Sequence, residues 1–332
     1  MLPTFDIRQL QDELPEAIEC LSRTYKDVGA FYLTANELLP SSLREEVFSQ
    51  ARQFFSLPLA TKQSINLSKT PNFRGYVGIN EEYTEGILDL KESFEFAKEI
   101  PAPACANPPR YYRLYGYNQW PPVSILSGFQ PVISAYQRRI ETIGEILLRS
   151  LARTFGLSPP PGSRSGYFPG ESCNFSRLIY YEHPTAFAEE SVRLTQHTDH
   201  VLFTIGIQNA PGLEVQTHDG HWIRVAPRKE DLVIFLGELA EFWTRGYYPA
   251  CVHRVLNQSL DQERISLTTF FLPDLQYVMQ PLDLDHIPQS RGSEISAVRS
   301  NSRASDGALN ESGSFVVGDK EWERLKSILP GG

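Results

Sequence analysis

Hydrophobic and polar positions divide the chain into a helical part, a strand-rich part and a polar part. In the first part, two stretches repeat apolar residues at intervals of three and four, which predicts amphipathic helices over Ser41–Phe55 and Phe129–Phe155. Ser42 followed by Glu45 predicts a capping box at the start of the first helix. Gly156 predicts the C-terminal cap of the second helix.

From about residue 174 to 273 the pattern changes to short β-rich runs separated by turn residues. The predicted strands are Asn174–Tyr181, Val201–Gln208, Leu213–Gln216, Trp222–Val225, Leu232–Leu236, Cys251–Leu256 and Ile265–Leu272. Asp219-Gly220 stands between two of these runs and predicts a hairpin. Many short strands separated by turn residues favour a sandwich or jelly roll over a parallel sheet with crossover helices.

The polar part follows the last predicted strand. Residues 289–314 are rich in Ser, Gly and Asn and poor in large apolar residues, which predicts a flexible segment. A short amphipathic helix is expected over Asp319–Leu329, and it would dock on the body of the protein through Trp322, Leu325 and Ile328.

These patterns predict three regions. Residues 1–160 are expected to form an N-terminal helical or mixed region that packs on the core. Residues 161–288 are expected to form the β-rich core. Residues 289–332 are expected to form a flexible C-terminal segment that ends in a short helix and could close over a site as a lid.

Composition narrows the class of protein. The 332 residues include 31 Lys and Arg against 40 Asp and Glu, and the net charge of −9 argues against nucleic-acid binding. The four cysteines form no CxxC pair, which argues against a zinc ribbon or a secreted disulfide scaffold. No apolar run approaches membrane-spanning length, and the N-terminus lacks the pattern of a secretory signal. We therefore expect a cytoplasmic protein that binds neither nucleic acid nor membranes; its oligomeric state stays open.

The candidate chemistry lies in the strand-rich part. On an extended strand, residues two apart project from the same face, so His197 and Asp199 can converge on one ion. His253, in a later β-rich run, supplies a third ligand. Two imidazoles and one carboxylate form the set that suits non-haem Fe(II) oxygen chemistry. Taken alone, His253 has an equally good explanation as a buried, hydrogen-bonded histidine.

A second motif strengthens this interpretation. Arg264 and Ser266 follow His253 by eleven and thirteen residues and lie two apart on a predicted strand. An Arg on a strand neighbouring the metal ligand can grip a carboxylate with its planar fork, with a hydroxyl alongside. Each motif is common by chance, but the order HxD, His, Arg-x-Ser within predicted strands is not.

On these residues the chain resembles the non-haem iron oxygenases of the isopenicillin N synthase type, which include the plant and microbial 2-oxoglutarate-dependent dioxygenases. The resemblance covers about residues 1–280. Further segments similar to family motifs are Phe54–Lys62 (FFxLPxxxK), Arg74–Tyr76 (RGY), Asp89–Phe96 (D-KE-F), Asn118–Pro121 (NxWP) and Gly212–Val215 (GLxV). The family's N-Y-Y segment reads Ile179-Tyr180-Tyr181 here, so Ile179 replaces its Asn.

The resemblance implies a mainly β fold with flanking helices, built on a distorted double-stranded β-helix (a jelly roll, or cupin-like core). It implies Fe(II) on the catalytic residues His197, Asp199 and His253. It also implies that 2-oxoglutarate chelates the iron while its far carboxylate pairs with Arg264. Ser266 and Tyr181 would assist in binding this cosubstrate, and O2 would take the last position on the metal.

The implied reaction is oxidation of an unactivated C–H bond of a small metabolite by hydroxylation, desaturation or ring formation, with release of succinate and CO2. Secondary metabolism is its typical setting. Two alternatives stay open at this point. One is a 2-oxoglutarate-independent oxidase of the isopenicillin N synthase type, in which Arg264 and Ser266 hold a substrate carboxylate. The other is a non-catalytic relative that keeps the jelly roll.

The remaining histidines near these motifs are expected to have other roles. His200 directly follows Asp199 and is expected to point away from the iron, as a surface or supporting residue. His218 and His221 flank the predicted Asp219-Gly220 turn and are expected to be exposed.

Overall fold

The structure, a computed structural model, describes residues 1–84, 87–88, 91–158, 167–168, 170–182, 192–256, 263–282 and 313–328. Except for its last two residues, the predicted flexible segment 289–314 lies outside these ranges. Within the described ranges, no helix is long and apolar enough to cross a membrane.

Two β-sheets form the centre of the fold. The larger sheet consists, in spatial order, of β1 (Thr4–Asp6), β2 (Ala30–Thr34), β12 (Asp231–Leu236), β9 (Phe203–Gln208), β14 (Arg264–Phe271), β7 (Phe175–Tyr181), β6 (Glu92–Ala97) and β3 (Gly75–Val77). The smaller sheet consists of β11 (Trp222–Arg224), β10 (Leu213–Gln216), β13 (His253–Leu256) and β8 (Val192–His197). Two short pairs, β4 (Tyr83–Thr84) with β5 (Ile87–Leu88) and β15 (Val278–Met279) with β16 (Phe315–Val316), complete the described strands.

From β7 to β14 the chain passes back and forth between the two sheets. The strands β7, β9, β12 and β14 lie in the larger sheet, and β8, β10, β11 and β13 lie in the smaller one. All pairings among them are antiparallel. This alternation wraps two facing sheets around one interior and confirms the predicted jelly roll.

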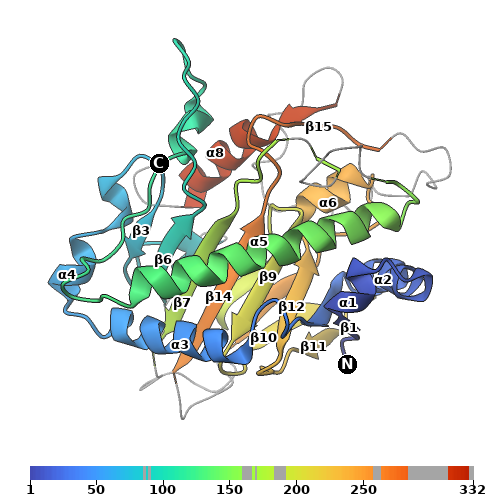
Figure 1. Ribbon diagram of the computed structural model, residues 1–332, viewed down its shortest axis with the longest axis horizontal. Coiled ribbons are helices and arrows are strands. Elements are labelled where there is room, and N and C mark those ends of the chain that lie inside the picture. The colour runs from blue at the N-terminus through green and yellow to red at the C-terminus, as the bar shows by residue number, and fades with distance from the viewer. Residues whose placement is uncertain are drawn as a thin grey trace.

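Helices cover the outer face of the larger sheet. The long helix α5 (Phe129–Arg153) crosses in front of the strands, and α3 (Ser41–Phe55) lies beside it (Figure 1). Apolar side chains of both helices and of the outer sheet face form one large buried core. The other helices are α1 (Ile7–Gln11), α2 (Pro15–Asp27), α4 (Leu59–Gln63), α6 (Glu238–Trp243), α8 (Val317–Ile328) and the 3₁₀ turns η1 (Leu67–Lys69) and η2 (Arg110–Leu114).

A second apolar core lies between the two sheets. Ile179, Tyr181 and Phe235 of the larger sheet meet Val215 and Val255 of the smaller sheet there. This core occupies only part of the jelly-roll interior. The rest of the interior holds polar and charged side chains, and these form the site described below.

The C-terminal helix α8 docks on the body of the protein, as predicted. Trp322 and Leu325 are buried, and the Trp322 ring lies against Phe73 with the ring centroids 5.3 Å apart. Just before the helix, Phe315 of β16 packs on Phe242 of α6. The side chain of Ile328 lies outside the described set.

Most predicted elements form within two residues of their expected ends. The predicted helix cap and hairpin turn are also present. Gly156 has a positive φ of 69° after α5, and Gly220 has a φ of 93° in the turn between β10 and β11. The capping box of α3 is wrong. The helix begins directly after Pro40, which makes no side-chain cap, so Ser42 already lies inside the helix.

The N-terminal region does more than pack on the core. Its strands β1, β2, β3 and β6 belong to the larger sheet itself. The apolar pattern of the flanking helices dominates this region of the sequence, so the short strands between them were missed. The predicted strand runs also leave out β8, although His197 at its end was expected on an extended strand. β8 is an edge strand whose residues are mostly half-exposed and polar.

Candidate functional site

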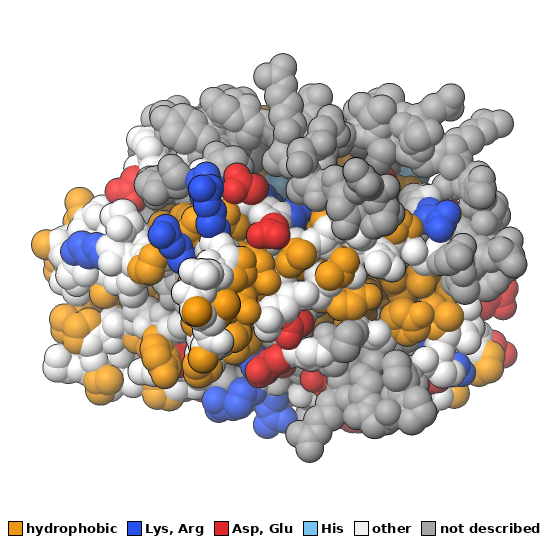
Figure 2. Space-filling model, turned by 90° about the horizontal axis from the view of Figure 1, so that it is seen from above, with side chains coloured by type: hydrophobic (Ala, Val, Ile, Leu, Met, Phe, Trp, Pro, Cys, Tyr) orange, Lys and Arg blue, Asp and Glu red, His pale blue; other side chains and the backbone are white. Residues whose placement is uncertain are grey.

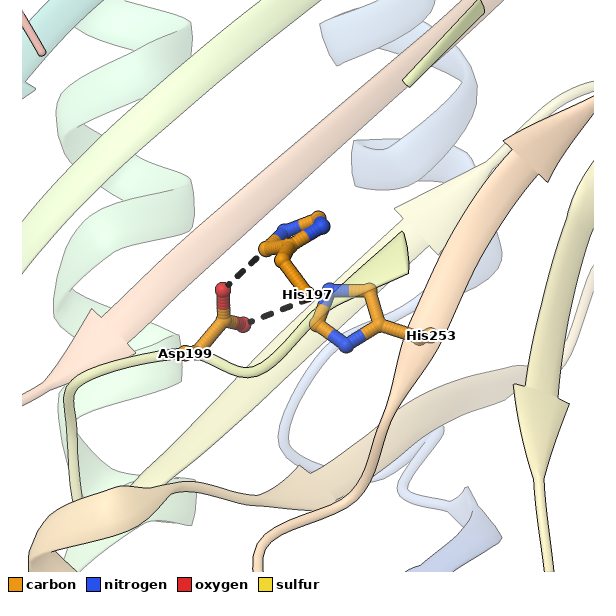
Figure 3. Close-up of side chains that lie close together, drawn as sticks. All are labelled: His197, Asp199 and His253. Atoms are coloured by element: carbon orange, nitrogen blue, oxygen red, sulfur yellow. Dashed lines mark ion pairs between the residues drawn. The ribbon is translucent and has the colours of Figure 1, made fainter. Parts of the chain in front are cut away.

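His197, Asp199 and His253 meet inside the jelly roll. His197 ends β8, His253 begins β13, and the two residues lie opposite each other in neighbouring antiparallel strands. The Nε2 atoms of His197 and His253 lie 3.6 and 3.7 Å from the two carboxylate oxygens of Asp199 (Figure 3). One ligand atom from each residue lies within 4.8 Å of the other two. The three side chains that the sequence singled out therefore share one point.

Asp199 reaches this point by a different route from the predicted one. β8 ends at His197, so His197 and Asp199 are not two residues of one extended strand. Asp199 lies in the turn that follows, where its main-chain carbonyl accepts a 2.8 Å hydrogen bond from the amide of Glu238. Its Oδ2 accepts a 2.5 Å hydrogen bond from the hydroxyl of Thr204 on β9. The contacts of this turn orient the carboxylate. The alternation of side chains along an extended strand does not.

Glu238 at the start of α6 holds both neighbours of Asp199. Its two carboxylate oxygens accept hydrogen bonds from the Thr198 hydroxyl at 2.6 Å and from Nδ1 of His200 at 3.0 Å. His200 therefore points away from the metal-ligand cluster, as expected, and supports the turn. Sequence reasoning missed Glu238, because an acidic residue at a helix start carries no local sign of a partner 38 or 40 residues away.

The orientation of both imidazoles suits metal binding. Nδ1 of His197 lies 2.8 Å from the carbonyl of Thr195, and Nδ1 of His253 lies 3.2 Å from the carbonyl of Cys251. A protonated Nδ1 that donates to each carbonyl leaves Nε2 as the free lone pair on each ring. The Nε2 atoms are the ones that face Asp199.

Electrostatics favour an ionised Asp199 and a neutral His253. Burial alone would raise the pKa of Asp199, but His253 and His197 outweigh it and hold that pKa far below its usual range. Burial lowers the pKa of His253 to about 4, and the neighbouring His197 acts in the same direction. Burial also tends to lower the pKa of His197, but the neighbouring Asp199 carboxylate raises it above the ordinary value, so this ring gives up its Nε2 proton when it binds a metal. A carboxylate beside imidazole lone pairs is a donor set that fits Fe(II).

Arg264 forms a second polar centre on the opposite sheet. It begins β14, where it is paired with Tyr181 of β7, and its guanidinium carbon lies 5.0 Å from the Tyr181 ring centroid. Its two terminal nitrogens donate to Ser266 Oγ at 3.2 Å and to Gln208 Oε1 at 2.9 Å. The predicted trio Arg264, Ser266 and Tyr181 is thus together, and Gln208 is a further member that the sequence did not suggest.

The guanidinium of Arg264 is buried. No carboxylate in the described part of the chain forms an ion pair with it, and its Nε has no hydrogen-bond partner there. Burying a lone cation is costly, so this arrangement fits a site that receives an anion. Gly212 makes room for it: its φ is 137°, and a Cβ there would lie 2.7 Å from the Leu256 carbonyl and 3.3 Å from Arg264 Nε.

The prediction that Arg264 lies on a strand beside that of His253 is wrong. β14 pairs with β7 and β9 in the larger sheet, whereas β13 belongs to the smaller one. Arg264 therefore faces the histidines across the interior. Of the remaining histidines, His221 is exposed as expected. His218 is only half-exposed, because its ring nitrogen contacts the carbonyl of Lys26.

Comparisons with known proteins agree with this geometry. A family model described as "non-haem dioxygenase in morphine synthesis N-terminal" matches residues 2–123, and one described as "2OG-Fe(II) oxygenase superfamily" matches residues 171–273. The chain is 33% identical over 300 residues to the 2-oxoglutarate-dependent dioxygenase citB of Monascus ruber. The aligned residues cover 85% of this chain and 88% of the relative. It is 30% identical over 291 residues to the clavatol oxidase claD of Penicillium crustosum, covering 80% and 82% of the two chains.

The fold is also found among solved structures. The dioxygenase for auxin oxidation of rice superposes with a TM-score of 0.68 at 20% identity, covering 98% of this chain and 96% of that one. This likeness supports the jelly-roll architecture.

Proposed function

Because the chain belongs to the Fe(II)- and 2-oxoglutarate-dependent oxygenase superfamily, we propose that His197, Asp199 and His253 hold its Fe(II) and that Arg264 holds the far carboxylate of its 2-oxoglutarate. The enzyme is an oxidoreductase that uses Fe(II), 2-oxoglutarate and O2. One observation carries the residue assignment. A three-ligand cluster and a buried Arg264, which has no acidic partner among the described residues, lie on facing sheets of one interior.

When bound, Fe(II) and 2-oxoglutarate supply the oxygen activation that oxidises a C–H bond of a small metabolite, with release of succinate and CO2. The protein's residues prepare this chemistry. Ionised Asp199 with two neutral imidazoles leaves a bound divalent iron with a net charge of +1, which favours an anionic cosubstrate. Gln208 and Ser266 hold the Arg264 fork in place, and Tyr181 closes one side of it. The apolar core beside them excludes water.

The relatives support a place in specialised metabolism. Two of the fungal relatives are named as a 2-oxoglutarate-dependent dioxygenase and a clavatol oxidase. We extend the small-metabolite substrate and the 2-oxoglutarate requirement to this chain, in preference to the 2-oxoglutarate-independent alternative. A cytoplasmic location is part of the same proposal.

On the face shown in Figure 2, acidic and basic side chains of the described residues are interspersed with hydrophobic ones.

An anaerobic titration tests the assignment. Fe(II) and then 2-oxoglutarate are added to the apo-protein, and the visible absorption is followed. We expect a weak charge-transfer band that requires both additions, because the oxo-acid end of the cosubstrate chelates the iron. Iron binding without a band on adding 2-oxoglutarate would favour the isopenicillin N synthase type of chemistry. Absence of iron binding would refute the ligand assignment.

A further inference from the structure

Four charged side chains form a buried network inside the jelly roll. Arg177 of β7 lies 2.7 Å from Glu82 and 2.8 Å from Glu95, and Lys91 lies 2.9 Å from the other oxygen of Glu82. The exposed fractions of these side chains run from 2% to 13%. We call Glu82, Lys91, Glu95 and Arg177 the interior ion cluster.

Strand register places this cluster in the same interior as the metal-ligand residues. Ile179 and Tyr181 of β7 point into the core between the sheets, and Arg177 lies two and four residues before them on the same face. Glu95 of β6 is paired with Arg177, so it shares that face. Tyr181 is paired with Arg264. Arg177 therefore lies about 13 Å along β7 from the cosubstrate end of the site.

The cluster also lies within electrostatic reach of the metal-ligand residues. Across the larger sheet, Arg177 is paired with Thr268 of β14, and Thr268 is paired with Gly206 of β9, two residues from Thr204, which bonds Asp199. Helix α8 brings in Arg324, which pairs with Glu321 at 2.6 Å. Burial lowers the pKa of Arg324, but Glu321 outweighs this, and Asp199 and Arg177 both act on it as well. Arg324 is thus coupled to charges of both the interior ion cluster and the metal-ligand residues.

A buried cluster of this kind is poorly explained by stability alone. Ion pairs in protein interiors cost much desolvation free energy, and apolar residues of similar volume often stabilise a fold as well or better. At one end of a catalytic interior, the same charges can recognise a polar group on a substrate.

The two carboxylates of the cluster differ in how firmly they are held. Burial alone would raise the pKa of Glu82, but its two cationic partners, Arg177 and Lys91, outweigh burial and keep that pKa below the ordinary value. Burial raises the pKa of Glu95, although Arg177 and the hydroxyl of Ser93 at 2.8 Å oppose it. Among the described residues, Glu82 pairs with two cations and Glu95 with one, so Glu95 is the carboxylate that Arg177 exchanges more easily.

We propose that Arg177, assisted by Lys91, binds a carboxylate group of the primary substrate and that this carboxylate takes the place of Glu95. The inference rests on the proposed function, because it assumes that the substrate lies beside the iron at the end opposite Arg264. It assigns the substrate to the small carboxylic acids. A planar guanidinium that already binds the carboxylates of Glu82 and Glu95 has the geometry to receive another.

Matched acids and amides test the proposal. Benzoate, cinnamate and 3-phenylpropionate are compared with their primary amides, and benzylamine serves as a cationic probe. Each is added anaerobically to enzyme saturated with Fe(II) and 2-oxoglutarate, so that the Arg264 end is occupied, and the change in the charge-transfer band is measured. Ligand-observed NMR follows the same probes in parallel. A missing band would then refute the proposed function, while the NMR comparison still decides the substrate class.

We expect the acids to bind roughly tenfold or more tightly than their amides, as a charge-assisted hydrogen bond would provide. Glu95→Gln removes the competing charge and should tighten binding of the acids further, with no change for the amides. Arg177→Gln should abolish the preference, and Arg177→Lys should keep part of it. Glu19→Gln, on the exposed face of α2, is the control and should match the wild type.

The variant Glu95→Gln keeps the test decisive even if Arg177→Gln does not fold, since a gain in binding cannot come from structural damage. Equal binding of acids and amides by the wild type would overturn the proposal. So would preferred binding of benzylamine, or an unchanged ratio of acid to amide affinity in Glu95→Gln.

Discussion

The hydroxyl of Thr204 donates a 2.5 Å hydrogen bond to Oδ2 of Asp199. Thr204 lies on β9 of the larger sheet, and Asp199 follows β8 of the smaller one, so this bond joins the two sheets at the metal-ligand cluster. The turn that carries Asp199 has no strand pairing of its own. Its carboxylate therefore depends on this bond and on the contacts of Glu238 for its direction.

The Thr204 bond can be removed almost without change in volume. We expect Thr204→Val to weaken Fe(II) binding by roughly tenfold, because a ligand carboxylate that loses its orienting hydrogen bond binds metal less well. Equilibrium Fe(II) titration measures the effect. Thr269→Val is a matched control, since Thr269 is also a buried sheet threonine but bonds Ser176 on the helix-covered face. Equal iron affinity in the wild type and both variants would show that Thr204 does not orient Asp199.

Removing a ligand should have a far larger effect. We expect His197→Ala or Asp199→Ala to abolish stoichiometric Fe(II) binding and turnover, because two remaining protein ligands hold a divalent ion poorly. Metal content after anaerobic loading and gel filtration measures this directly. His221→Ala removes an exposed histidine and should bind iron like the wild type. Full activity in either ligand variant would contradict the assignment of the triad.

Arg264→Gln should mainly change the need for cosubstrate. We expect the apparent KM for 2-oxoglutarate to rise by roughly tenfold to a hundredfold, because the far carboxylate loses a buried charged partner. Fe(II) affinity should stay the same, since Arg264 lies on the opposite sheet from the histidines. Succinate release at varied 2-oxoglutarate measures the effect, with Arg224→Gln on the exposed side of β11 as the control. An unchanged KM would place the anion site elsewhere.

The two glutamates of the interior ion cluster should affect stability in opposite ways. Burial, although opposed by Arg177, raises the pKa of Glu95. A carboxyl whose pKa is raised by folding does not lower the unfolding free energy at pH values below its pKa in the unfolded state, about 4.3. As pH rises from there toward its pKa in the folded state, the carboxyl lowers the unfolding free energy progressively. Relative to the wild type, Glu95→Gln should therefore gain on the order of 1 kcal/mol in unfolding free energy between about pH 4 and neutrality.

Glu82 provides the comparison. Its pKa is lowered, so it contributes stability that is present above the unfolded pKa and is lost as pH falls through the folded pKa. Glu82→Gln should be less stable than the wild type at neutral pH and approach it in acid. Urea unfolding at several pH values measures both variants. Differences that do not change with pH would show that neither carboxyl is coupled to folding in this way.

The docking of α8 can be tested at Trp322. Its ring is buried against Phe73, and the guanidinium of Arg113 lies 5.8 Å from it. We expect Trp322→Ala to lower the unfolding free energy by about 3 kcal/mol, through lost burial and the cavity that remains. Thermal and urea unfolding measure this, with Glu323→Ala on the exposed face of α8 as control. A change below about 0.5 kcal/mol would show that the helix is not held through this residue.

The local pattern of the sequence was enough for most of the core. Period and turn residues predicted the strands from β7 to β14 except β8, because buried strands carry continuous β-branched and aromatic runs. β8 is missing from the predicted strands because it is a partly buried edge strand with mostly polar residues. The N-terminal strands β2 and β3 are buried but short, and the stronger pattern of the flanking helices hid them. The capping box at Ser42 was wrong because α3 already begins at Ser41, directly after Pro40, which makes no side-chain cap.

The sequence by itself determined which side chains could hold the metal and the cosubstrate. His197, Asp199, His253 and Arg264 were identified from residue type and order, because the chemistry of their side chains does not depend on the fold. The tertiary structure alone decided how they meet. Asp199 is aimed by Thr204 and by a turn bonded to Glu238, and Arg264 approaches from the facing sheet. The interior ion cluster became visible only there as well, since contacts between residues far apart in the chain depend on how the sheets pack and leave no trace in local spacing.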